Sequence, residues 1–177
     1  DSAYLSSSYG RDQLYTADRE YLSVALKYGP DGAVYFSDWA DKQQCHNNRF
    51  EIWNRENGRL YRMQWDATYK PVKINLDKDS NEKLIGYLNH KNEWFTHTAQ
   101  HVLRQRAAAG RNLDGIVPVL KRHVLDASKD NRYRALIMLH ACGGLDQKTI
   151  RALLKDEDEH LVKQALLFAT EGGLKDT

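Results

Sequence analysis

Apolar and polar residues alternate along the first third of the chain, which is the pattern of half-buried β-strands. The clearest run is Ser23–Tyr28, in which Val24, Leu26 and Tyr28 alternate with smaller or more polar residues. A Gly-Pro-Asp-Gly sequence follows and strongly predicts a turn, because proline fixes φ and Asp-Gly tolerates positive φ. Ala33–Trp39 then predicts a second strand, so we expect a β-hairpin.

Two further strands are expected around this hairpin. Arg59–Trp65 alternates after the turn dipeptide Asn-Gly, and Ala3–Tyr9 is a weaker candidate near the start of the chain. Asp31 lies within the Gly-Pro-Asp-Gly turn and is interpreted as a turn residue. No Asp-x-Asp-x-Asp-Gly run supports a calcium site there.

The rest of the chain has helical periodicity, and the pattern repeats. Three segments each predict a short apolar helix, a polar turn and a longer helix: Leu84–Arg104, Ile116–Cys142 and Ile150–Ala169. An alanine occupies an equivalent position in each longer helix, where its small side chain lets neighbouring helices approach closely: Ala99, Ala135 and Ala165. Helix pairs repeated at this kind of period are typical of an α-solenoid.

Composition divides the chain at the same place as the periodicity. Residues 1–76 hold most of the aromatic residues, which favour strands, and residues 77–177 hold most of the leucines, which favour helices. We therefore expect an α+β protein with a β-rich domain over residues 1–76 and a helical domain over residues 77–177.

Bulk properties exclude several classes of protein. The chain has 177 residues, of which 41% are hydrophobic and 28% charged, as in a globular protein of one large or two small domains. A net charge of +2 gives no support to a nucleic-acid partner. No apolar run reaches the roughly 20 residues of a transmembrane helix, and two cysteines exclude a disulfide-dense scaffold. The chain begins at Asp1 with no signal-like segment, so we expect a processed protein or part of a longer one.

Two segments of the β-rich part resemble a known family. The run Gly29–Trp39 resembles the GPDGALYVSDW blade motif of propeller dehydrogenases related to glucose/sorbosone dehydrogenases, and Arg55–Arg62 is similar to the R-x-x-G-R-I-Y-R closing strand of that family. In large secreted proteins of planctomycetes and their relatives, such a propeller is followed by HEAT-like repeats and often by a cytochrome-type haem module. The resemblance covers about residues 10–170.

The resemblance implies a fold and a place for the chemistry. Residues 1–76 would form a β-rich partial propeller blade, followed by an α-solenoid of HEAT-like helix pairs. A propeller needs several four-stranded blades, so its remaining blades would come from the parent protein or another chain. Cys45-His46 lacks the second cysteine of the Cys-x-x-Cys-His haem signature. We therefore expect no cofactor on this chain, while PQQ or haem would belong to the parent, and an extracytoplasmic location.

The polar segment after the second strand contains the candidate ligand-binding residues. They are oxygen, nitrogen and aromatic side chains at a strand end and in the long loop that follows it, a normal place for binding residues: Asp38, Trp39, Asp41, His46 and Asn48. They could bind a metal ion or hydrogen-bond a sugar. The alternative is that Asp38 caps the strand end and that the loop is only solvated. No complete catalytic or metal site is predicted, so an enzymatic role of the chain stays uncertain.

The helical part contains a candidate interaction surface. Solenoids present their inner helices as a concave binding face, and here that face would include His97, His101, Arg104, Arg132 and Lys163. The alternative for these residues is a solvated helical surface. His97 and His101 are four residues apart, but Thr98 stands where a zincin motif has glutamate, so solvent-facing histidines are favoured over a metal site.

Two functions are therefore expected as alternatives. In the first, the chain is the last propeller blade and the HEAT-like scaffold of a larger sugar or alcohol dehydrogenase-like protein, and the redox centre lies elsewhere. In the second, it is a noncatalytic protein-interaction module built on a HEAT-like solenoid. The strand Ala33–Trp39 has three consecutive apolar residues and no charge before Asp38, which predicts that the sheet pairs with another polypeptide segment.

Overall fold

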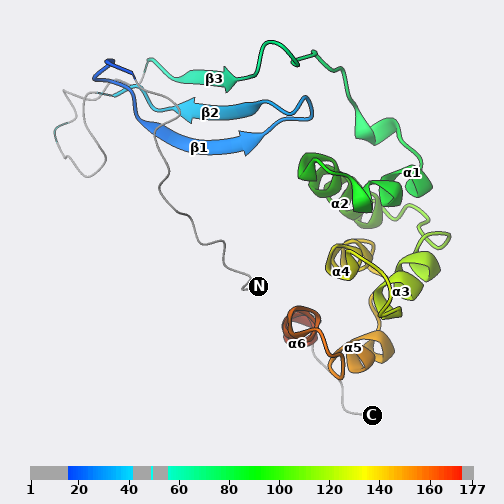
Figure 1. Cartoon of the computed structure of the whole chain (residues 1–177). Coiled ribbons are helices and arrows are strands. Elements are labelled where there is room, and N and C mark those ends of the chain that lie inside the picture. The colour runs from blue at the N-terminus through cyan, green and yellow to red at the C-terminus, as the bar shows by residue number, and fades with distance from the viewer. Residues whose placement is uncertain (1–15, 42–48, 50–55, 173–177) are drawn as a thin grey trace. The chain divides into compact units, whose positions relative to one another are not determined.

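The computed structural model describes residues 16–41, 49 and 56–172, and its secondary structure confirms an α+β protein (Figure 1). The chain divides into two compact units, residues 1–73 and residues 74–177, here called the sheet unit and the helical unit. The division falls slightly before the one expected from composition. Ile74 and Leu76 pack against the core of the helices, which assigns them to the helical unit.

The sheet unit contains a three-stranded antiparallel sheet. Its strands are β1 (Ser23–Tyr28), β2 (Val34–Asp38) and β3 (Arg59–Met63), in the order β1-β2-β3. The expected hairpin and the third strand are thereby confirmed. The candidate strand Ala3–Tyr9 lies outside the described residues.

The turn between β1 and β2 follows from its sequence. Gly29 N–H donates to the Ala33 carbonyl over 2.8 Å, and Gly32 adopts a φ of 77°, which glycine tolerates without steric cost. The Asp31 carboxylate accepts hydrogen bonds from Ala33 N at 3.1 Å and from Tyr35 Oη at 2.7 Å. Burial opposes ionisation of Asp31, but these hydrogen bonds hold its pKa below the ordinary value. Asp31 is therefore a turn residue.

A small aromatic cluster lies on one face of the sheet. Leu26, Phe36 and Tyr61 stand opposite one another across the three strands. The buried Phe36 ring stacks on Tyr61 with centroids 5.4 Å apart and meets Tyr21 edge-on at 6.4 Å. The described part of this unit has a small core, because most other large apolar residues of the strands are exposed: Val24, Leu26, Tyr28, Leu60 and Met63.

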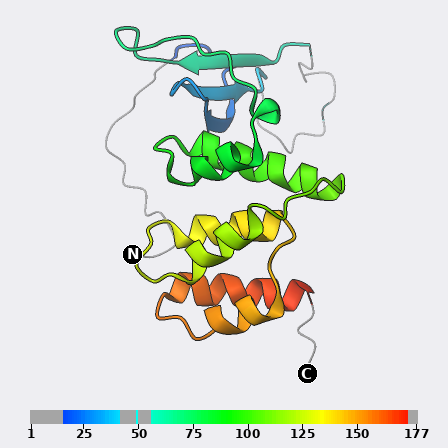
Figure 2. The same cartoon turned by 90° about the vertical axis from the view of Figure 1, so that its right-hand side faces the viewer.

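The helical unit consists of helix pairs joined by short turns. The bounds are η2 (Leu76–Lys78), α1 (Asn81–Gly86), η3 (Tyr87–Asn89), α2 (Glu93–Ala108), α3 (Val117–Leu125), α4 (Arg132–Ala141), α5 (Gln147–Leu153) and α6 (Glu159–Gly172). Within each pair, α1 packs on α2, α3 on α4 and α5 on α6. Between pairs, α4 packs on both α2 and α6, and α3 packs on α5 (Figure 2). The three predicted helix pairs are present.

Local sequence explains several helix boundaries. Ser80, Asn92 and Asp146 act as N-caps, and each side chain accepts a hydrogen bond from a backbone N–H in the first turn of its helix. Gly110 and Gly143 follow α2 and α4, each with a φ of 68°, the left-handed conformation in which helices commonly end.

The core of the helical unit matches the repeat pattern. Ala99, Ala135 and Ala165 are fully buried, as predicted, beside leucines from every helix pair. Among the described residues, none of the helices combines the length and apolarity needed to cross a membrane.

Candidate binding sites

Asp38 is buried at the end of β2 and has a structural environment. Its carboxylate accepts hydrogen bonds from Leu22 N at 2.7 Å, Ala40 N at 3.0 Å and Arg59 Nε at 2.6 Å. Burial alone would raise the pKa of Asp38, but the two backbone N–H groups and the guanidinium lower it below its ordinary value. Asp38 therefore holds β2, β3 and the segment before β1 together.

Arg59 extends this network, and no role for its side chain was predicted from the sequence pattern. Its Nη1 lies 2.5 Å from Asp18 Oδ2, so one guanidinium connects two carboxylates. These acids raise the pKa of Arg59, with the Asp18 hydrogen bond as the largest cause. Arg59 lies directly opposite Asp38 in the β2–β3 register. The signal available in the sequence was the pair of opposite charges on two expected strands, which can pair across a sheet.

The residues after Asp38 do not share one environment. Trp39 is exposed, with 61% of its surface accessible, whereas Asp41 is buried. Between them, the buried Ala40 has a φ of 54°, a left-handed conformation that is uncommon for alanine. His46 and Asn48 lie outside the described residues. Of the five candidate residues, the structure therefore places Asp38, Trp39 and Asp41, and Asp38 is already fully engaged.

The exposed residues of the predicted interaction surface lie on α2 and α6, on either side of α4. On α2, His97, His101 and Arg104 are all exposed, and on α6, Lys163 is exposed. Two contacts tie α4 to its neighbours along this side: Arg134 Nη2 lies 2.6 Å from Glu93 Oε1 on α2, and Tyr133 Oη donates to Gln164 Oε1 on α6 over 2.9 Å. His97 and His101 continue the row of Glu93 at intervals of one helical turn. We call this surface the α2/α4/α6 face.

Arg132 does not belong to the α2/α4/α6 face. Its side chain is buried, Nε donates to the Val124 carbonyl at 2.8 Å, and the guanidinium forms a bidentate ion pair with Asp156. The Asp156 hydrogen bond is the largest cause of the raised pKa of Arg132. The expectation of a surface role for Arg132 is corrected, because the guanidinium joins the second helix pair to the turn of the third.

His101 on α2 has a cationic neighbour. Arg104 Nη2 lies 3.2 Å from His101 Nδ1, which places a guanidinium beside the imidazole. Within the described ranges, no three His, Cys, Asp or Glu side chains are arranged to hold a metal ion. The geometry of these histidines fits surface hydrogen bonding.

The cysteine that the structure describes is part of the core. Cys142 is buried at the end of α4, and burial raises the pKa of its thiol to about 11. A thiol with such a pKa is almost entirely protonated near neutral pH and is a weak nucleophile. This agrees with the interpretation of Cys142 as a small core residue, while Cys45 lies outside the described residues.

Comparison of the chain with known protein families, curated proteins and solved structures finds no match. Function must therefore be inferred from the surfaces themselves.

Proposed function

We propose that the chain is a noncatalytic protein-interaction module and that the α2/α4/α6 face of its HEAT-like helical unit binds the partner. The observation that carries this proposal is the packing of α4 against both α2 and α6 (Figure 2), together with exposed polar side chains on these helices. Buried alanines and leucines fix the spacing of these helices, so the face is a rigid platform rather than a set of independent side chains.

The chemistry of the face favours an acidic, extended protein segment. Arg104 on α2 and Lys163 on α6 are exposed cations of this face, and Arg134 forms an ion pair with Glu93. Exposed Tyr133 on α4 and Leu167 on α6 add aromatic and apolar surface. Cations interspersed with apolar groups complement an acidic peptide that also carries apolar side chains.

A charge-reversal experiment tests this proposal. Fluorescence anisotropy with labelled decaglutamate measures binding to the chain and to the double variant Arg104→Glu/Lys163→Glu. We expect the variant to bind about tenfold more weakly, because two attractive charges become repulsive. The matched control is Arg122→Glu/Lys148→Glu, which makes the same change in net charge at exposed positions on α3 and α5.

The control should change affinity less than about twofold, since its residues lie on the other helix layer. Equal losses in the two double variants would show a non-specific charge effect and contradict the proposal. Equal binding of a thymidine oligonucleotide and decaglutamate would contradict it as well.

A second candidate function is favoured by the surface of the sheet unit. Val24, Leu26 and Tyr28 on β1 and Leu60 on β3 are all more than 60% exposed. So many exposed large apolar side chains on a three-stranded sheet favour coverage by another polypeptide segment. In this alternative the sheet is one blade of a larger extracytoplasmic, glucose/sorbosone dehydrogenase-like propeller, and PQQ or haem would be held by other parts of that protein.

Sedimentation velocity of the isolated chain tests this second candidate. Apolar strands that lack their neighbouring blades should cause concentration-dependent association at micromolar concentration, and replacing Leu26 and Leu60 by serine should reduce it. A monomer that stays stable and free of aggregates without another fragment would contradict the blade interpretation.

A further inference from the structure

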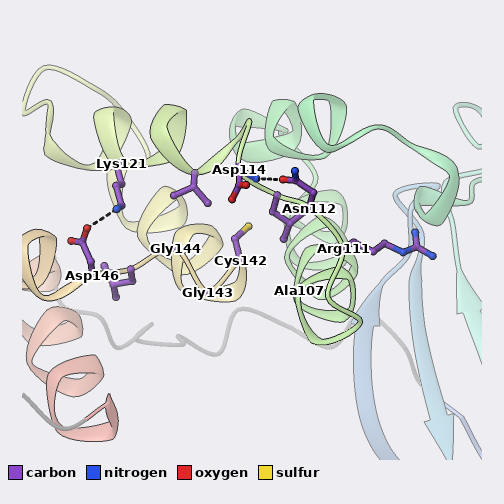
Figure 3. Close-up of a pocket in the computed structure, with 12 residues that line it drawn as sticks. Ala107, Arg111, Asn112, Asp114, Lys121, Cys142, Gly143, Gly144 and Asp146 are labelled. Atoms are coloured by element: carbon purple, nitrogen blue, oxygen red, sulfur yellow. Dashed lines mark hydrogen bonds and ion pairs between the residues drawn. The ribbon is translucent and has the colours of Figure 1, made fainter.

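A groove of about 530 Å³ lies in the helical unit (Figure 3), and its lining includes none of the residues named for the α2/α4/α6 face. It is formed by the end of α2, the α2–α3 loop, α3, and the turn after α4. Its volume is within the range of small-ligand pockets in proteins, and it is large enough for one long side chain.

The groove has an apolar wall that its sequence maintains. Leu113, Val117 and Leu145 line it, together with Cys142 at the end of α4. A Cβ atom at Gly144 would lie only 2.7 Å from Val117 Cγ1, so glycine is needed for the turn after α4 to lie this close to α3. The apolar part of the groove is therefore preformed by close backbone packing.

The carboxylate of Asp114 is the group at this wall that suits a cation. Asp114 lines the groove, and no described side chain forms an ion pair with its carboxylate (Figure 3). Lys121 is occupied, because its Nζ lies 2.6 Å from Asp146 Oδ2, and the Arg111 side chain extends away from the groove. The C-terminal ends of α2 and α4 border the groove, as does the N-terminal end of α3 at Val117, so helix ends of both signs meet there.

We propose that this groove binds an arginine side chain of a partner protein, with the guanidinium on Asp114 and the aliphatic stem against Leu113, Val117 and Leu145. Arginine suits this arrangement because its stem packs on apolar surface while its planar head forms two parallel hydrogen bonds to a carboxylate. The proposal goes beyond the function of the α2/α4/α6 face, since it needs neither Arg104 nor Lys163.

Titration of the full chain with Nα-acetylargininamide, followed by ¹H–¹⁵N NMR, tests the proposal. The amides of Gly143, Gly144 and Asp114 should shift together along one saturation curve. The corresponding citrulline amide has nearly the same shape without the charge. Its affinity should be lower by at least about fivefold, as expected for loss of an ion pair.

Two variants test whether the Asp114 carboxylate contributes to binding of the arginine probe. Asp114→Asn should weaken binding of the arginine probe about fivefold, because it removes the charge and leaves the backbone hydrogen bond from Asp114 N to Asn112 Oδ1 intact. Asp130→Asn removes the same charge from an exposed position that does not line the groove, and binding should stay within about twofold of the original chain.

The same spectra show whether each variant remains folded. Groove amides that do not shift with the arginine probe, equal shifts with the citrulline probe, or equal losses in Asp114→Asn and Asp130→Asn would overturn the proposal. None of these outcomes depends on binding of decaglutamate, so the two proposals fail separately.

Discussion

The sheet unit and the helical unit differ in how far they bury their apolar side chains. In the helical unit, leucines and alanines of successive helices form one continuous buried cluster. In the sheet unit, the described buried apolar side chains are few, namely Ala33, Phe36 and Ala40, while Val24, Leu26, Tyr28 and Leu60 are exposed. Helix pairs bury their apolar faces against sequence neighbours, whereas a small sheet needs a second layer.

The ionic interactions differ in the same way. Arg132 and Asp156 pair between well-packed helices, and each side chain is less than a fifth exposed. Arg59 pairs with the fully buried Asp38, but the arginine itself is 35% exposed. The comparison indicates a helical unit that is stable through its own contacts and a sheet unit whose apolar surface is suited to a further partner.

The largest expected effect concerns the buried ion pair of the helical unit. Arg132→Met should destabilise that unit by about 3–5 kcal/mol, because the Val124 carbonyl loses its donor and the Asp156 carboxylate loses its cation and keeps the hydrogen bond from Asp158 N. Urea unfolding measured by circular dichroism checks this value. The control Arg122→Met alters an exposed residue of α3 and should change stability by less than about 0.5 kcal/mol.

A matched pair of leucines compares the two units directly. Leu136→Ala creates a cavity at a fully buried position and should cost about 2–5 kcal/mol. Leu26→Ala makes the same chemical change at a position 64% exposed and should cost less than about 0.5 kcal/mol. A similar loss of unfolding free energy for both variants would mean that β1 is covered in the isolated chain.

Enlarging the repeated alanines should have an intermediate effect. Ala99→Leu, Ala135→Leu and Ala165→Leu each insert a larger side chain into a closed contact, with an expected cost of about 1–3 kcal/mol. Thermal melting followed by circular dichroism measures the change. Unchanged melting temperatures for all three variants would contradict the equivalence of the three helix pairs.

The smallest effect is expected at the N-cap of α5. Asp146 accepts from Thr149 N at 2.8 Å, and its pKa is lowered to about 2, first by Lys121 and then by Thr149. Asp146→Ala should cost about 1 kcal/mol at neutral pH, since the cap is lost and the ion pair is half exposed.

The pH dependence of this effect has a definite sign. An aspartate whose folded-state pKa is depressed contributes its stability above the unfolded pKa, near 4, and loses it as the pH falls toward 2. The ionic part of the difference between the original chain and Asp146→Ala should therefore disappear between about pH 4 and pH 2. Urea midpoints across this range measure it, and a difference that grows on acidification would contradict this account.

Local patterns predicted the elements well because these patterns act over short distances. The hairpin follows from alternation around a strong turn sequence, and the buried alanines follow from helical periodicity. The strand bounds differ at the ends, where β3 stops at Met63 instead of reaching Trp65.

Side-chain roles were harder to predict because they depend on distant partners. The sequence around Asp38 fits a ligand-binding residue, but in the structure its carboxylate accepts a hydrogen bond from Arg59, 21 residues away. The sequence around Arg132 fits a surface residue, but in the structure its guanidinium pairs with Asp156, 24 residues away. The groove combines residues from two helix pairs and a glycine turn, so its shape depends on tertiary packing that no local motif describes.

Native-state hydrogen exchange of the full chain tests most directly the claim that the two units differ in self-sufficiency. We expect amides of α2 and α4 to exchange only through large-scale unfolding, whereas amides of β1 and β3 should exchange through local opening with much lower protection. Protection of β1 and β3 equal to that of α2 and α4 in the isolated chain would contradict the account.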